Sequence, residues 1–285
     1  MTLSDREAVP PVNEPVNASS KDMLNSKTCF VAEVVPSNRR LVEFSIEFAT
    51  NTPGEMADVA LVLRKHHVNL LTGFHDAAKW SFFADVTEIN LSVDEVVKEI
   101  SNIASIKKVN VGKEQSEGFI VDSLHRQLTW GPFRSIVIRA DVMSSILNRI
   151  KGIFGAEGKA GTALVLGMGE AAGRTAYKGV SAQLSAEVLR SHFQDEMFLY
   201  TAQGWGEVKV ASLDMDKGTA CLRVFNSFEC ADPKGNPNSS CDFIRGHLTG
   251  LLSETFGKRV VVTETMCSAR GHSCCQFEIE AKQAR

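Results

Sequence analysis

Long apolar runs are missing from this sequence of 285 residues, since no stretch approaches the roughly 18 consecutive apolar residues that a membrane-spanning helix needs. Residues 1–28 also lack the apolar core of a signal peptide, and their prolines and polar residues predict a disordered tail. We therefore expect a soluble protein with no membrane partner.

An excess of charge of either sign is missing as well. The sequence has 31 Lys and Arg residues against 34 Asp and Glu residues, which gives a formal net charge of −3. Such a balance provides no general attraction to nucleic acid or to anionic lipid, and no DNA-reading motif is present. We therefore expect no direct contact with nucleic acid.

A dinucleotide-binding fingerprint is also absent. Residues 167–173 have the spacing G-x-G-x-x-x-G, whereas the fingerprint requires G-x-G-x-x-G between a strand and a helix. The surrounding residues follow the pattern of an Ala-rich helix, so these small residues are predicted to allow close packing of helices. A reductase needs a hydride source, and the sequence has neither this loop nor a recognisable flavin site.

Cysteine pairs with C-x-x-C spacing are absent, although the chain contains seven cysteines. All of them except Cys29 lie beyond residue 220. An odd number of cysteines gathered in one region is typical of a reducing compartment and a metal site rather than of a disulfide framework. We therefore expect a cytoplasmic protein.

Four residues near the C-terminus form a candidate set of metal ligands, namely Cys241, Glu264, Cys267 and Cys275. Three thiolates and one carboxylate make a tetrahedral set that suits Zn²⁺, and a set without an open position predicts a structural ion rather than a catalytic one. Thiolate-rich sites also accept ferrous iron, and the alternative without a metal is a group of ordinary buried thiols.

The local pattern predicts a hairpin around this set. Residues 259–264 and 274–280 are predicted strands, and residues 268–271 form the turn between them. Because side chains alternate along a strand, only one residue of the adjacent pair Cys274 and Cys275 can face the other ligands.

Cys241 lies just before a predicted helix that ends at Phe256 and Gly257. The helix dipole favours a thiolate at this position. Cys230 is the substitute ligand if Cys241 points away.

A longer stretch places these residues in an order typical of a known family. The stretch contains Asn226-Ser227-Phe228-Glu229, Cys241, Gly246, Gly250-Leu251, Glu264-x-x-Cys267 and Gly271-x-x-x-Cys275-x-Phe277. It resembles the 4-vinyl reductase domain family over about residues 124–281. The resemblance implies a zinc ion held by Cys241, Glu264, Cys267 and Cys275, as in the aromatic-sensing input domains of phenol-responsive bacterial activators.

The same resemblance implies a ligand cavity between the sheet and the helices of this domain. A small apolar or aromatic ligand would bind there, in a pocket that is mostly aromatic with few polar groups. The candidate lining residues are His192, Phe193, Trp205, Phe225 and Phe243. Each of them has an alternative role as a plain core residue.

The apolar spacing predicts the other elements of this domain. Helices are expected over about residues 142–154, 159–178 and 183–196. Residues 205–213 and 220–225 follow as an antiparallel pair of strands with a turn between them.

The segment from Arg40 to Gly112 has the pattern of a smaller unit, with strands and helices in the order βαββαβ. Its first turn and helix, together with Val68-Asn69-Leu70-Leu71, resemble ACT domains, which bind small effectors, often amino acids. The candidate effector-binding turn is Asn51, Thr52, Pro53, Gly54 and Glu55. Asn51 replaces the usual acidic residue, and the alternative role of such a unit is association alone.

The predicted fold class is α+β, with a ferredoxin-like βαββαβ (ACT-like) unit followed by several helices packed on an antiparallel sheet with a zinc site. The predicted organisation is a tail at 1–28, the ACT-like domain at 29–113, a linker at 114–130 and a 4-vinyl-reductase-type domain at 131–285.

The predicted function is that of a regulatory protein that senses a small molecule and signals through a homodimer or a partner. The alternatives are an accessory protein or reductase of tetrapyrrole metabolism, and a non-catalytic assembly scaffold. An enzymatic role is disfavoured, because no site for a hydride-donating cofactor is recognised.

Overall fold

The computed structural model describes residues 32–34, 38–50, 52–76, 78–125, 128–130, 133–153, 159–230 and 241–282. The predicted tail at 1–28, Cys29 and Asn51 therefore lie outside the described residues. The chain divides into two compact units between Ile136 and Val137, whereas the sequence pattern placed a linker at 114–130. Each unit is described by itself.

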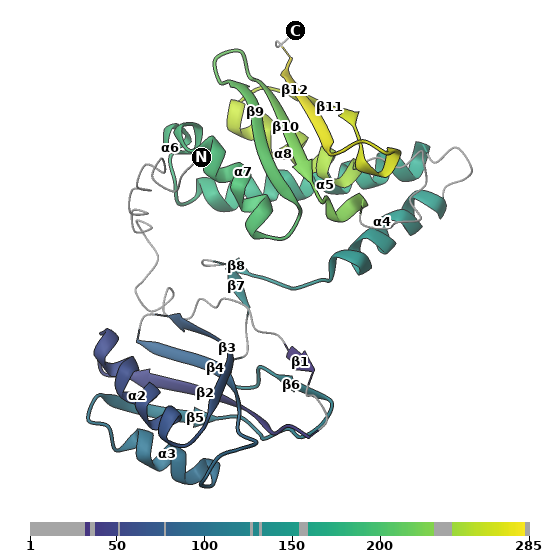
Figure 1. Cartoon of the computed structure of the whole chain (residues 1–285). Helices are drawn as coiled ribbons and strands as arrows, with labels where there is room; N and C mark the ends of the chain where they lie inside the picture. The colour runs from purple at the N-terminus through teal and green to yellow at the C-terminus, as the bar shows by residue number, and fades with distance from the viewer. Residues whose placement is uncertain are drawn as a thin grey trace. The chain divides into compact units, whose positions relative to one another are not determined.

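The first unit is a four-stranded antiparallel sheet with two helices (Figure 1). Its elements follow the predicted order: β2 (Leu41–Phe48), α2 (Pro53–Lys65), β3 (Asn69–Asp76), β4 (Lys79–Asp85), α3 (Val93–Ser101) and β5 (Ile106–Val111). The strand order across the sheet is β3-β4-β2-β5. Alternate residues of β2, such as Phe44 and Ile46, are fully buried in one core with Val59 of α2 and Ile100 of α3.

Short strand pairs complete this unit. They are β1 (Ala32–Val34) with β6 (Phe119–Val121), and β7 (Thr129–Trp130) with β8 (Phe133–Arg134), and both pairs are antiparallel. Ile120 of β6 packs with Leu41 and Phe83 in a cluster separate from the main core of the unit.

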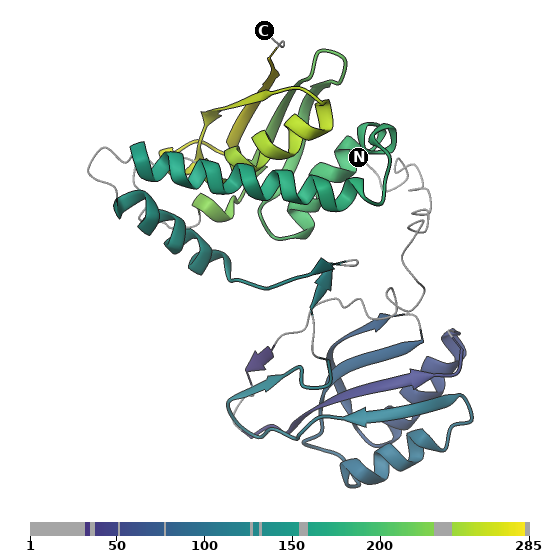
Figure 2. The same cartoon turned by 180° about the vertical axis from the view of Figure 1, so that it is seen from behind.

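The second unit is built in layers (Figures 1 and 2). Its antiparallel sheet has the order β11-β12-β10-β9, formed by β9 (Glu207–Asp214), β10 (Thr219–Phe225), β11 (Val260–Met266) and β12 (Cys275–Ala281). Helix α8 (Asp242–Phe256) packs on this sheet, and α5 (Lys159–Ser181) covers α8 on its outer side. Helix α4 (Ala140–Ile153) lies against α5. Among the described helices, none combines the length and the apolar character needed to cross a bilayer.

Helices α5 and α8 approach each other through glycines. A Cβ atom added to Gly169 or Gly173 would lie 2.2 or 2.1 Å from a backbone oxygen of α8, and one added to Gly246 or Gly250 would lie 2.1 Å from a backbone oxygen of α5. No side chain fits at such distances, so the two backbones are in direct contact. The predicted use of the small residues for close helix packing is confirmed.

The single helix predicted over residues 183–196 is wrong. The structure has two helices here, α6 (Ala186–Ser191) and α7 (Phe193–Ala202), which are separated at His192. His192 has φ −110° and ψ 27°, outside the helical region. The break lets α7 take its own direction and bury Phe193 and Tyr200.

Candidate metal centre

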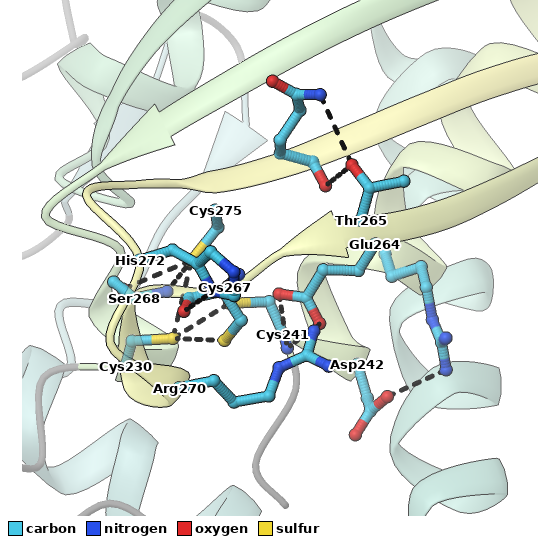
Figure 3. Close-up of polar contacts among 12 residues, drawn as sticks. Cys230, Cys241, Asp242, Glu264, Thr265, Cys267, Ser268, Arg270, His272 and Cys275 are labelled. Atoms are coloured by element: carbon cyan, nitrogen blue, oxygen red, sulfur yellow. Dashed lines mark hydrogen bonds and ion pairs between the residues drawn. The ribbon is translucent and has the colours of Figure 1, made fainter. Parts of the chain in front are cut away.

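Four cysteine sulfur atoms meet at one end of the second unit (Figure 3). They come from the end of the short 3₁₀ helix Phe228–Cys230, the residue before α8, the residue after β11 and the first residue of β12, and are those of Cys230, Cys241, Cys267 and Cys275. All four lie within 4.8 Å of one another. Cys274 is buried apart from this group, so the prediction that only one of the adjacent cysteines joins it is confirmed.

The sulfur separations fit a metal ion bound by four thiolates. Sγ of Cys230 lies 3.2 Å from that of Cys241 and 3.6 Å from those of Cys267 and Cys275, and Cys241 and Cys275 are 3.5 Å apart. Tetrahedral zinc with Zn–S bonds of about 2.3 Å needs sulfur atoms about 3.8 Å apart. A small adjustment of the side chains therefore suffices for zinc, and all four cysteines are free thiols.

The predicted ligand Glu264 lies beside the sulfur cluster. Its Oε2 and Oε1 atoms accept from the backbone N–H of Cys241 at 3.2 and 3.3 Å, and Nη2 of Arg270 is 3.6 Å from Oε2. Burial, with the nearby charge of Cys267, raises the pKa of Glu264 to about 7. The structure thus gathers five candidate donors, with Cys230 in the sulfur cluster and Glu264 on the backbone of Cys241.

A buried carboxylate positions Cys230 against α8. Glu229 accepts hydrogen bonds from the backbone N–H groups of Phe243 and Ile244, at 3.0 and 3.1 Å, in the first turn of this helix. These N–H groups have no partner within the helix, and the helix dipole favours a negative charge at this end. Nζ of Lys151 on α4 lies 3.0 Å from Glu229 and 3.1 Å from Asp242. The ion pairs therefore join α4, the turn before Cys230 and the start of α8.

Hydroxyl and backbone N–H groups surround the sulfur atoms. Ser268 donates its backbone N–H to Sγ of Cys275 at 3.4 Å, with its hydroxyl oxygen 3.3 Å away, and the hydroxyl of Ser227 lies 3.4 Å from Sγ of Cys241. Hydrogen bonds from the thiols of Cys241, Cys267 and Cys275 hold the pKa of Cys230 far below its ordinary value. Such contacts stabilise thiolate, the form that binds metal.

A cluster of aromatic rings lies further along α8. Trp205 packs 5.7 Å from Phe243 and 4.7 Å from His247, measured between ring centroids, and Tyr200 packs 5.2 Å from Trp205. The hydroxyl of Tyr200 lies 2.6 Å from Nδ1 of His247. Burial lowers the pKa of His247 to about 4, so its ring is neutral at physiological pH. The cluster therefore combines aromatic rings with one buried polar pair.

The five predicted pocket residues divide between different surroundings. Trp205 and Phe243 belong to the aromatic cluster, and Phe193 stacks on Phe256 at 6.2 Å. His192 is exposed and lies 3.0 Å from the backbone oxygen of Val188. Phe225 lies under Nζ of Lys209, 5.1 Å from its ring centroid. The structure thus does not bring His192 and Phe225 to the aromatic cluster.

Tyr200 is the member of the cluster that the sequence pattern did not single out. It is buried in α7 and follows Phe193 by about two helical turns. A polar ring on the apolar side of a short helix is the signal that identifies such a residue.

The predicted effector-binding turn of the first unit is closed by its own glutamate. Glu55 accepts from the backbone N–H of Thr50 at 3.2 Å and of Thr52 at 3.4 Å, and Pro53 begins α2. This capping arrangement occupies the amide groups that a ligand carboxylate would use. Gly54 has open space around its Cα atom, as close approach of a ligand requires.

Comparisons with known proteins agree with the pattern of the last third of the chain. Residues 221–281 match the vinyl-4-reductase domain. An uncharacterised protein of Methanocaldococcus jannaschii is 25% identical over 97 residues, and the match covers 34% of this chain and 58% of that protein. This chain therefore spans little more than half of that curated relative.

Three solved structures are similar to part of the chain. The phenol-responsive sensory domain of the transcription activator PoxR is 18% identical, with a TM-score of 0.45 over 54% of this chain and 80% of that chain. A vinyl-4-reductase family protein from Methanocaldococcus jannaschii is 20% identical, with a TM-score of 0.34 over 52% and 85%. Trafficking protein particle complex subunit 3 from Naegleria fowleri is 14% identical, with a TM-score of 0.39 over 50% and 95%.

The five candidate donors all lie within the matched segment. The predicted resemblance to the 4-vinyl reductase family is therefore confirmed for residues 221–281, which match the domain of that family.

Proposed function

We propose that the second unit is a small-molecule sensing domain, in which a metal centre fixes one end of α8 and an aromatic ligand binds beside the following turns of the same helix. The observation that carries this proposal is the position of the aromatic cluster on α8. Phe243 lies two residues after Cys241, and His247 lies one turn further along. The helix therefore links the metal centre to the rings.

The metal in this proposal is zinc, held by Cys230, Cys241, Cys267 and Cys275. Four thiolates fill a tetrahedron and leave no position for a substrate, so the ion has a structural role. It ties the segments that carry the four cysteines into one unit, which makes binding energy part of folding energy. Glu264 then supports the centre by holding the backbone N–H of Cys241.

The ligand would be recognised by stacking on the rings of Tyr200, Trp205 and Phe243. A small aromatic molecule gains burial and ring contacts there. Bound ligand can bias the packing of α8 only if it binds one arrangement of the helices better than another. Because α8 contacts α5 through backbone atoms, a shift of α8 must move α5 as well.

The output is assigned to a partner or to a second copy of the chain, in the cytoplasm. The strand order β3-β4-β2-β5 supports a ferredoxin-like, ACT-like first unit. The occupied amides at Thr50 and Thr52 favour association over effector binding as the task of that unit.

Tryptophan fluorescence tests the ligand site. We expect benzyl alcohol, a small aromatic probe, to change the emission of the full chain in a saturable manner, and Phe243→Ala to weaken this effect. Phe225→Ala is the matched control, since Phe225 lies outside the aromatic cluster. The absence of saturable binding for aromatic probes of this size would contradict the proposal.

A further inference from the structure

Glu196 is a buried acid without a partner among the described residues. It is 7% exposed, and neither of its carboxylate oxygens has a hydrogen-bond partner in the part of the chain that the structure describes. Buried polar groups in folded proteins nearly always have a partner, and leaving one unpaired costs free energy. Two unpaired oxygens on one carboxyl group therefore require an explanation.

The contacts of α7 show where this carboxyl group lies. Phe193 stacks on Phe256 of α8 at 6.2 Å, and Tyr200 contacts His247 of the same helix at 5.3 Å. The two helices thus run in opposite directions, and Glu196 lies between these contacts on the buried side of α7. The facing turns of α8 contribute buried leucines, including Leu251. An acid therefore stands in an apolar layer with aromatic contacts before and after it along α7.

The polar pair nearest along these helices is already occupied. The hydroxyl of Tyr200, one turn after Glu196, is bound to Nδ1 of His247 at 2.6 Å. No side-chain donor reaches Glu196 from any residue between 159 and 230 or between 241 and 282. The missing partner of the carboxyl group is therefore a cation or a hydrogen-bond donor from outside these segments.

A protonated amine fits this setting better than a neutral hydroxyl group. A carboxylate and a cation neutralise each other when both are buried, whereas a hydroxyl group satisfies only one acceptor site. The faces of the rings of Tyr200 and Trp205 also attract cations. Burial raises the pKa of Glu196 to about 7, so near neutral pH little free energy is needed to exchange its proton for an organic cation.

We propose that Glu196 recognises a small aromatic ligand through a protonated amine, bound between α7 and α8. This inference rests on the proposed sensing function and adds the chemical class of the ligand. Stacking on the rings provides affinity for an aromatic group, and the carboxylate of Glu196 selects the ammonium group.

Three probes of the same size separate the inference from the proposed function. Benzylamine, benzyl alcohol and toluene differ only in the group attached to the ring, and their affinities for the full chain are measured by calorimetry. We expect benzylamine to bind about tenfold or more tightly than the other two, because a buried charged hydrogen bond is worth more than a neutral one.

Substitution of the acid completes the test. Glu196→Gln should lower the affinity for benzylamine by about tenfold or more and leave that for benzyl alcohol little changed. Asp195→Asn is the matched control, since Asp195 is the neighbouring exposed acid on α7. Equal affinities for the three probes, or an unchanged affinity for benzylamine in Glu196→Gln, would overturn the inference alone. Binding of none of the probes would overturn the proposed function as well.

Discussion

The ammonium group of Lys151 lies 3.0 Å from the carboxylate of Glu229, a side chain with 0% exposure, and ties α4 to the turn that carries Cys230. Glu229 also holds the first turn of α8 through two backbone N–H groups. The metal centre therefore depends on a contact between residues 78 positions apart in the sequence.

Lys151→Met should destabilise the protein strongly. The change leaves Glu229 and Asp242 buried without the ammonium group that neutralises them, and breaking a buried ion pair costs about 3 kcal/mol or more. Chemical denaturation of the full chain measures the free energy of unfolding. Arg149→Met on the exposed side of α4 is the control and should cost little. Equal stability of the two variants would contradict the role given to Lys151.

Gly173→Ala should disrupt the contact between α5 and α8. The new Cβ atom would lie 2.1 Å from the backbone oxygen of His247, so the helices must separate, at a cost of about 2 kcal/mol or more. Gly167→Ala on the same helix has nothing within 4 Å and should stabilise by about 1 kcal/mol through helix propensity. Thermal unfolding of both variants checks this prediction, which fails if their melting temperatures change in the same direction.

The stability contributed by Glu196 should depend on pH. Its pKa of about 7 in the folded protein exceeds the ordinary value of 4.5, so the folded state binds more protons between these values. The contribution is therefore complete below pH 4.5 and is lost as the pH rises through 7. Relative to Glu196→Gln, the wild type should lose about 2.5 kcal/mol of unfolding free energy between about pH 5 and pH 8.

Urea denaturation at both pH values measures this difference, because the glutamine variant carries the same background of other titrating groups. A difference between wild type and variant that stays constant with pH would show that the carboxyl group of Glu196 does not titrate in this range.

Tyr200→Phe should expose the dependence of the aromatic cluster on its polar pair. The change leaves Nδ1 of the buried His247 without its partner, at a cost of about 1 to 3 kcal/mol. His247→Phe combined with Tyr200→Phe should recover part of this loss, since both polar groups are then removed. Chemical denaturation of the three variants measures these changes. A double variant less stable than expected from the sum of the single changes would contradict the pairing.

Local patterns in the sequence predicted much of the fold. Alternating apolar residues located β2 and β4, and Gly257 at φ 63° ends α8 as expected for a left-handed C-cap. The break at His192 was not predicted, because tertiary packing of α7 decides it. The apolar spacing over residues 183–196 is compatible with one continuous helix.

The candidate site was predictable in part for the same reason. The hairpin pattern placed Cys267 and Cys275 correctly beside each other, because their spacing is local. The choice between Cys230 and Glu264 depends on Lys151 and Glu229, whose contact joins distant parts of the chain. The exposure of His192 likewise follows from the direction of α7 rather than from its own neighbours in sequence.

The most direct test of the four-cysteine centre is elemental analysis of the full chain purified without chelators, together with Cys230→Ser and Glu264→Gln. We predict about one zinc ion per chain in the wild type and in Glu264→Gln, and a loss of most of the metal in Cys230→Ser, because a structural zinc needs all four ligands. Retention of zinc in Cys230→Ser with its loss in Glu264→Gln, or a well-folded wild type without metal, would contradict this centre.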